Sequence, residues 1–347
     1  MQQTIDVIGM SGRFIAFNRT RILMNVMRKC CVAAAVACAA ISGSVQAQAY
    51  PSKPIRWIVP FPPGGGTDVV SRTLTQKLTE AWGQQVIADN RPGSGGTIGL
   101  AIAAKLPADG YNIVLGQLAN VAIAPALYAK LPYDPVKDLT PVTLALTSPL
   151  ILVAHPSFPA RNVKELIAVA KSKPDAVTFG SPGNGTTGHL GTEIIKTAGG
   201  VRMTHIPYKG ATPAFTGLLG GEIAVYMSSI QPAMPMLNAG RVKALGVTST
   251  KRIATLPNVP TISETGIPGY EVTNWYGVMV PAGVPKEVLA KLHGELVRIL
   301  KLPDVQQRFQ AEGGDITPNT PEQFAAFIGA EIAKWDKAVR ASGAKVD

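Results

Sequence analysis

The chain has 347 residues, of which 46% are hydrophobic and 16% charged, and its formal net charge is +11. Five basic residues and one acidic residue precede position 50, so the remaining stretch of about 300 residues keeps a net charge of +7. Its Lys and Arg residues alternate with Asp and Glu, as in KEVLAKLHGELVRILK, which argues against a nucleic-acid-binding protein and favours attraction of small anions.

Residues 24–49 have the layout of a secretory signal peptide. Arg28 and Lys29 precede an apolar run of about ten to twelve residues, and small residues follow it. The run is too short to span a bilayer, which needs roughly 20 apolar residues. We therefore expect cleavage after Ala47 or Ala49 and export to the periplasm.

The predicted signal also bears on the start of the chain and on its cysteines. A signal begins close to its basic pair, so we expect the start to be Met24 or Met27 rather than Met1. All three cysteines lie in the signal, at Cys30, Cys31 and Cys38. The exported part would then have no thiol, disulfide or thiolate metal site, and no cofactor is expected.

Apolar runs, glycine-rich turns and helical patterns alternate along the rest of the chain. This order predicts an α/β fold with largely parallel strands, and the length predicts two domains. The expected strands are 55–61, 84–90, 112–117, 150–156, 176–182, 202–208, 242–248 and 275–285. The expected helices are 68–82, 97–106, 163–172, 189–198, 212–219, 286–300, 303–312 and 321–340.

Two further patterns concern the packing of these elements. No flexible linker separates two domains, so the chain is expected to cross between them in ordered strands. The last predicted helix carries an apolar stripe that is more typical of core than of a ligand site. Its members are Phe324, Phe327, Ile328, Ile332 and Trp335.

Three loops share one construction, in which a strand is followed by glycine and hydroxyl residues and then by a helix. They are FPPGGGTD (61–68), NRPGSGGTIG (90–99) and SPGNGTTGHL (181–190). A helix start offers unpaired N–H groups to an anion, glycine allows close approach, and hydroxyl groups add donors. Any one of them alone is well explained as a tight turn, but together they predict a shared carboxylate pocket.

Nucleotide binding and catalysis fit the sequence less well. GNGTTG (183–188) matches a dinucleotide fingerprint, but no ribose-binding acid follows about 20 residues on, and PPGGGTD lacks the Gly-Lys-Ser/Thr ending of a P-loop. There is no Gly-x-Ser-x-Gly motif, and the four histidines occur singly. We therefore expect neither an enzyme nor a metal site.

Four side chains near these loops have two possible roles each. Asp68 falls in the first turn of a helix, where it either caps N–H groups or contacts a ligand ammonium. Lys209 either meets an anionic ligand or is solvated, and Tyr208 either packs or donates its hydroxyl. His189 either caps the helix that it opens or contacts a ligand.

Several motifs together resemble the Bug family of extracytoplasmic solute receptors, the substrate-binding components of tripartite tricarboxylate transporters. They are YPSKPIRWIVPFPPGGGTDVVSR, NRPGSGGTIG, HIPYKG and AGRVKALGVTSTKRIATLPNVPTISETGIPGYEVTNWYGVMVPAGVP. The resemblance covers residues 50–347, and the order and spacing of the motifs make it specific.

The resemblance implies a two-lobed periplasmic binding protein fold of type II, in which two α/β lobes close on a ligand like a Venus flytrap. Each lobe is expected to hold a mixed, mostly parallel sheet flanked by helices. The first lobe would comprise residues 50–150 and 273–347, and the second lobe residues 151–272. The crossings would fall near 150–155 and 272–280.

The resemblance also implies a binding site. Loops 61–68 and 90–97 would grip a ligand carboxylate, mostly through backbone groups and bridging waters, and second-lobe loops would set specificity. The candidate ligand-binding residues are Phe61, Gly64, Gly65, Thr67, Asp68, Ser94, Gly95, Gly96, Thr97, Gln117, Ser148, Ser181, Asn184, Thr186, Thr187, His189, Tyr208, Lys209, Gly210 and Ser228.

The implied function is capture of a small organic carboxylate by a monomeric periplasmic protein that delivers it to a membrane permease. A ligand-dependent sensor that contacts a histidine kinase would use the same site. Family ligands include di- and tricarboxylates, acidic amino acids and aromatic acids. The chain has Ala224 where the family commonly has an acidic residue, so the second-lobe contacts and the ligand stay open.

Overall fold

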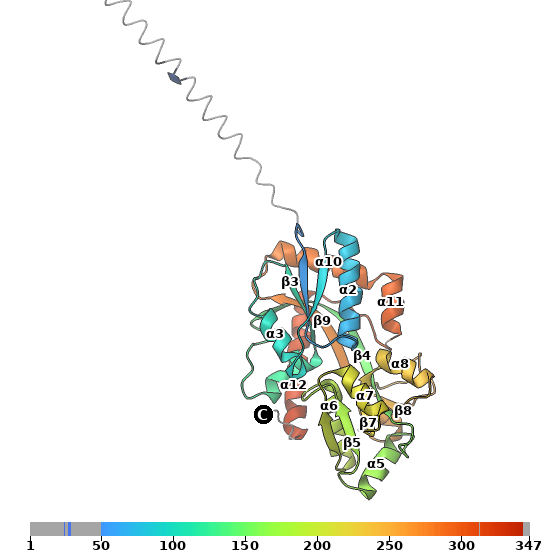
Figure 1. Ribbon diagram of the computed structural model, residues 1–347. Coiled ribbons are helices and arrows are strands. Elements are labelled where there is room, and N and C mark those ends of the chain that lie inside the picture. The colour runs from blue at the N-terminus through green and yellow to red at the C-terminus, as the bar shows by residue number, and fades with distance from the viewer. Residues whose placement is uncertain (1–23, 25–26, 29–49, 312, 343–347) are drawn as a thin grey trace, which may run out of the picture. The chain divides into compact units, whose positions relative to one another are not determined.

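The computed structural model describes residues 24, 27–28, 50–311 and 313–342 (Figure 1). The predicted signal and its cysteines lie outside the described residues, apart from Met24, Met27 and Arg28. Residues up to Tyr50 form a unit separate from Pro51–Asp347. The description below concerns the second unit alone.

The described strands form one sheet in the order β2-β1-β3-β9-β4-β7-β5-β6, and β8 also pairs with β4. The strands are β1 (Ile55–Val59), β2 (Val86–Asn90), β3 (Asn112–Gln117), β4 (Leu139–Ala154), β5 (Thr178–Ser181), β6 (Thr204–Pro207), β7 (Val225–Ser229), β8 (Lys243–Val247) and β9 (Thr273–Pro281).

Strand β4 changes partners along its length. It pairs with β9 as far as Pro149, which lies opposite Thr273, and it pairs with β7 from Leu150 onward. We call β2, β1, β3, β9 and the first part of β4 the first segment of the sheet. The last five residues of β4 with β5 to β8 are the second segment.

The strand directions differ between the outer and central parts of the sheet. The pairs β1–β2, β1–β3, β5–β6 and β5–β7 are parallel. The pairs that include β4 or β9 are antiparallel. The predicted parallel strands are therefore confirmed for the outer parts, whereas the two long central strands run against their neighbours.

Helices cover both segments, with α2, α3 and α10 beside the first and α5 to α8 beside the second (Figure 1). They are α2 (Gly66–Trp82), α3 (Thr97–Ala103), α4 (Ala124–Leu127), α5 (Val163–Ser172), α6 (Thr187–Gly199), α7 (Ala211–Leu219), α8 (Ile230–Asn238), α9 (Ile262–Thr265), α10 (Lys286–Leu300), α11 (Pro303–Gln310) and α12 (Pro321–Ser342). A 3-10 turn covers Ser94–Gly96 and a π-helical turn covers Ala119–Ile123.

Many boundaries follow from local sequence. Helix α5 begins after Asn162, whose side chain accepts the N–H of Glu165 at 2.9 Å, as an N-cap residue does. Strand β3 and helices α5 and α10 have the predicted limits. The first eleven residues of β4 and helix α8 were not predicted, and of strand β7 only an end near Ser228 was expected.

Helix α12 packs its apolar stripe onto the central strands, as predicted. Phe324 and Trp335 are buried, and the Phe324 ring meets Trp275 edge-on with centroids 5.8 Å apart. The ring occupies the space where Gly277 of β9 has no side chain, since a Cβ there would lie 1.9 Å from the Phe324 ring. Burial of such a side chain stabilises the fold by about 1.5–3 kcal/mol, so α12 secures the centre of the sheet.

Candidate functional site

A small cavity of about 60 Å³ lies beside the point where β4 changes partners. Its lining comes from both segments of the sheet: Phe61, Pro62, Gly65, Gly66, Thr67, Gln117, Leu150, Pro182, Thr186, Thr187, Gly188, Ala211, Tyr226, Met227, Ser229, Asn274 and Tyr276. None of these is Asp, Glu, Lys, Arg or His. An anion in this cavity would have to be held by neutral groups.

Four helices begin at or beside the small cavity. Their N-cap residues are Gly65 before α2, Thr186 before α6, Gly210 before α7 and Ser229 before α8. None of these caps is closed by a side-chain hydrogen bond. First-turn N–H groups and the partial positive charge of a helix start stabilise anions, so the cavity suits a carboxylate without a cationic side chain.

A larger cavity of about 570 Å³ adjoins the small one. Its lining is Phe61, Pro62, Pro92, Gly93, Ser94, Gly95, Gly96, Ile98, Tyr128, Pro182, Gly183, Asn184, Pro207, Tyr208, Lys209 and Gly210. Phe61, Pro62 and Pro182 line both cavities and so form the wall between them. Among the described residues, Lys209 is the one cation that lines either cavity, and no acidic side chain lines them.

Loops from the two segments touch each other at the large cavity. Thr212 donates its hydroxyl to the carbonyl oxygen of Pro63 at 3.4 Å. Gly210 has a φ of +125°, and a Cβ there would lie 2.7 Å from the Pro62 ring. Glycine at position 210 therefore allows both the turn and the close contact between the segments.

Asp68 supports the glycine loop 61–68 through hydrogen bonds. Its carboxylate accepts hydrogen bonds from the Gly64 N–H at 3.1 Å, Arg72 at 2.9 Å and Asn90 at 3.0 Å. Burial raises the pKa of this carboxyl, but the three donors together hold it below its ordinary value. Asp68 lines neither cavity and therefore acts on the shape of the loop.

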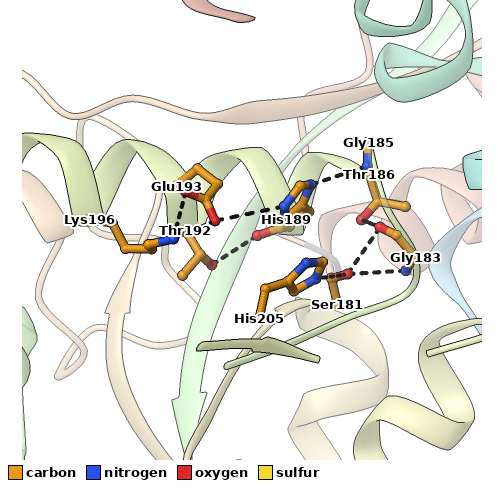
Figure 2. Close-up of polar contacts among 10 residues, drawn as sticks. Ser181, Gly183, Gly185, Thr186, His189, Thr192, Glu193, Lys196 and His205 are labelled. Atoms are coloured by element: carbon orange, nitrogen blue, oxygen red, sulfur yellow. Dashed lines mark hydrogen bonds and ion pairs between the residues drawn. The ribbon is translucent and has the colours of Figure 1, made fainter. Parts of the chain in front are cut away.

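A histidine pair supports the glycine loop 181–190 (Figure 2). The rings of His189 and His205 stack with centroids 4.0 Å apart. The Gly185 N–H donates to His189 Nδ1 at 3.1 Å, and His205 Nε2 lies 2.7 Å from the Ser181 hydroxyl oxygen. That oxygen also accepts the Gly183 N–H at 3.2 Å, so Gly183 is linked to His205 through Ser181, and Gly185 bonds to His189 directly.

Burial keeps both histidines uncharged. Burial, aided by the nearby Lys196 ammonium, lowers the pKa of His189 to about 4 and that of His205 to about 3. Because His189 Nδ1 accepts a hydrogen bond, its proton sits on Nε2, 3.8 Å from a carboxylate oxygen of Glu193. His189 lines neither cavity and supports the loop instead.

The structure distributes the predicted site residues over three places. The small cavity has Phe61, Gly65, Thr67, Gln117, Thr186 and Thr187. The large cavity has Phe61, Ser94, Gly95, Gly96, Asn184, Tyr208, Lys209 and Gly210. Neither is lined by Gly64, Asp68, Thr97, Ser148, Ser181, His189 or Ser228. The three glycine loops thus meet around two adjoining cavities.

Several cavity residues escaped the sequence reasoning. Asn274 and Tyr276 line the small cavity from β9, and Ser229 lines it from the end of β7. Alternate residues of a strand share a face, so polar Asn274 and Tyr276 within an apolar strand were a usable signal. Ser229 was missed although it directly follows Ser228, where a strand end was expected.

Two other kinds of site are absent from the part of the chain that the structure describes. No helix there has the length and apolar character needed to cross a membrane. No group of three or more His, Cys, Asp or Glu side chains is placed there to hold a metal ion.

Known proteins with similar sequences and folds cover nearly all of the second unit. The chain is 37% identical over 312 residues to protein BugT of Bordetella pertussis, which covers 90% of this chain and 96% of that protein. The periplasmic binding protein BugD has 34% identity and a TM-score of 0.82, and the comparison covers 85% of this chain and 99% of that one. The two-lobed periplasmic binding protein fold and the resemblance to the Bug family are thereby confirmed.

Two similar structures contain carboxylates. Rpa4515 of R. palustris, solved with adipate, has a TM-score of 0.83 and 34% identity over 86% of this chain and 100% of that one. MatC of Rhodopseudomonas palustris, solved with bound malate, has a TM-score of 0.79 and 31% identity over 84% and 100%. The neighbours are substrate-binding proteins and not enzymes. Residues 70–344 match the model of the tripartite tricarboxylate transporter family receptor, and the chain belongs to this family of solute-binding proteins.

Proposed function

We propose that this protein captures a small organic carboxylate between its two lobes and delivers it to a permease of the tripartite tricarboxylate type. The observation that carries the proposal is the small cavity, which lacks charged side chains and is bordered by uncapped helix starts. Such helix starts bind anions through N–H groups. The adipate and malate complexes of the two R. palustris relatives support the same ligand class.

In this proposal the lobes follow the two segments of the sheet. Residues 50–150 and 273–347 make the first lobe, and residues 151–272 make the second. The chain crosses where β4 leaves β9 after Pro149 and returns where β9 begins at Thr273. Closure then brings the start of α2 in the first lobe toward the starts of α6 and α7 in the second.

The two cavities suggest how a ligand with two acidic groups lies. One carboxylate occupies the small cavity against the helix starts, and the rest of the ligand extends past Phe61 toward the large cavity. Lys209 is exposed there and lines that cavity, so it meets the second carboxylate.

Calorimetric titration with a panel of mono-, di- and tricarboxylates, including malate and adipate, tests the proposal. A ligand at 100 times its Kd should stabilise the folded protein by about 2.7 kcal/mol, which a thermal unfolding scan detects. Absence of heat and of any thermal shift across the whole panel would contradict carboxylate capture.

Delivery and export need separate measurements. Uptake of the bound carboxylate by cells should fall when this gene is deleted and recover when it is restored. The mature protein recovered from the periplasm should begin at Gln48 or Tyr50, which N-terminal sequencing checks. A protein that keeps Met24 or Met27 at its N-terminus would contradict the cleaved signal.

A further inference from the structure

A buried carboxamide joins the two lobes beside the small cavity. Asn274, the second residue of β9, is 3% exposed. Its Nδ2 donates to Oε1 of Gln117 at 3.0 Å, and its Oδ1 accepts the hydroxyl of Thr187 at 3.2 Å. Gln117 ends β3 and Thr187 begins α6, so these two hydrogen bonds connect elements of different lobes.

The three residues are not equally free to move. Gln117 pairs with Tyr276 in the sheet, and its N–H donates to Oδ1 of Asn120 at 2.9 Å. Asn274 lies opposite Ser148 in the first-lobe pairing of β4 with β9. Both are therefore fixed to the first lobe. Thr187 belongs to α6, which packs on β5 and β7 of the second lobe, so the Thr187–Asn274 hydrogen bond depends on the angle between the lobes.

The same hydrogen bonds determine which donor and acceptor groups the small cavity presents to a ligand. Because Gln117 Oε1 accepts from Asn274, the Nε2 donor of Gln117 is the part of that amide left for the cavity. Because Thr187 donates its hydroxyl proton to Asn274, that side chain keeps only acceptor capacity. We call the hydrogen bonds that join Gln117, Asn274 and Thr187 the bridge. The bridge directs the amide donor of Gln117 toward the place where a carboxylate would lie.

We infer that Asn274 is a positioning residue. Its two hydrogen bonds fix the start of α6 relative to the end of β3, and this fixes the arrangement of the lobes that binds a ligand. The expected effect on ligand affinity rests on the proposed function. The two hydrogen bonds of Asn274 join protein groups and do not require a ligand. A residue buried only to fill space would affect stability and leave both ligand affinity and the mobility of α6 unchanged.

The test compares Thr187→Val, which removes the hydroxyl at nearly constant volume, with Thr187→Ser, which keeps it. Calorimetry with malate and adipate should show Thr187→Val binding roughly 3- to 10-fold more weakly, as expected for one neutral hydrogen bond, and Thr187→Ser, which keeps the hydroxyl, should recover most of that loss. Asn274→Leu should weaken binding further. Adding Thr187→Val to Asn274→Leu should then have no additional effect, because the bridge is already lost.

Hydrogen exchange without ligand gives an independent measurement. Amides of the first hydrogen-bonded turn of α6, residues 190–194, should exchange faster in Thr187→Val than in Thr187→Ser, while amides of β1 exchange at the native rate. Equal exchange and equal affinity in the two variants would overturn the inference, as would additive losses in the double variant. If neither malate nor adipate binds the native protein, the proposed function fails for these probes, and the exchange comparison still decides whether the bridge holds α6.

Discussion

The glycine loops 61–68 and 181–190 both line the small cavity, but side chains of different chemical type support them. The first loop is organised by a carboxylate, Asp68, which gathers three donors including the Arg72 guanidinium. The second is organised by two uncharged, stacked histidines and the Ser181 hydroxyl. In both arrangements the first N–H groups of the helix, α2 or α6, have no side-chain cap. A charged side chain is therefore not required to support such a loop.

The difference predicts distinct responses to acid. The carboxylate of Asp68 has its pKa lowered, so its contribution is complete above the unfolded value of 3.8 and is lost only as pH falls below that value. The histidines titrate at about 6.5 in the unfolded chain, whereas folding lowers their pKa to about 4 and about 3. The second loop should therefore be the acid-sensitive one.

The largest expected effect comes from these histidines. Between pH 6.5 and 4 the unfolded chain binds protons that the folded His189 and His205 refuse, so the free energy of unfolding should fall by about 1.4 kcal/mol per pH unit for each. Urea unfolding at a series of pH values measures this slope. His205→Gln should make the slope shallower. The same slope in native protein and His205→Gln would refute the contrast between the loops.

Removal of the carboxylate should have the next largest effect. Asp68→Ala removes the acceptor of the Gly64 N–H and one of the acceptors of both Asn90 and Arg72, and we expect a loss of about 2–3 kcal/mol in the free energy of unfolding. Asp336→Ala is the matched control, because it also breaks an ion pair with an arginine four residues on, but at the surface. That control should cost less than about 1 kcal/mol. Equal losses in both variants would mean that Asp68 is not the support of its loop.

Substitutions of Gly65 distinguish a role of this residue in folding the loop from a role in binding the ligand. A Cβ at this position would lie 3.5 Å from the Ala211 Cβ, an ordinary contact, so Gly65→Ala should fold and bind. The two further methyl groups of Gly65→Val enter the small cavity, and affinity for the carboxylate that binds best should fall at least about 30-fold. Calorimetry measures the affinity and circular dichroism the fold. A Gly65→Val protein that unfolds would show that the position serves the loop, and one that binds normally would place the ligand elsewhere.

The smallest effect concerns the large cavity. Lys209→Gln should weaken binding of a dicarboxylate about 3-fold, because an exposed ion pair contributes little, and the loss should shrink at high salt. A monocarboxylate should bind both proteins alike. Equal loss for mono- and dicarboxylates would assign Lys209 to the first carboxylate and merge the roles of the two cavities.

Local signals predicted most of the elements but not how the loops meet. Strand β3 and helix α10 show clear apolar periodicity and were found at their limits. The first part of β4 contains Pro141 and Pro149, which read as turn residues, although each lies within the long strand pairing of β4 with β9. Helix α8 escaped because prolines interrupt it.

The site was predictable in composition and not in arrangement. The glycine loops were identified from their residues alone, since the strand-to-helix pattern is local. Their division between two cavities depends on Phe61 and Pro62 lining both cavities together with Pro182, which lies far from them in the sequence. Asn274 likewise gained its role from partners more than 80 positions away, which no local pattern records.

The central position of β9 also has a consequence for folding. Strand β3 ends at Gln117, yet its neighbour in the sheet begins at Thr273. The first segment therefore lacks the strand that joins β3 to β4 until almost the whole chain is available, and pairings between such distant residues form slowly. A chain built in this way stays unfinished through most of its synthesis, a property that suits the export proposed above.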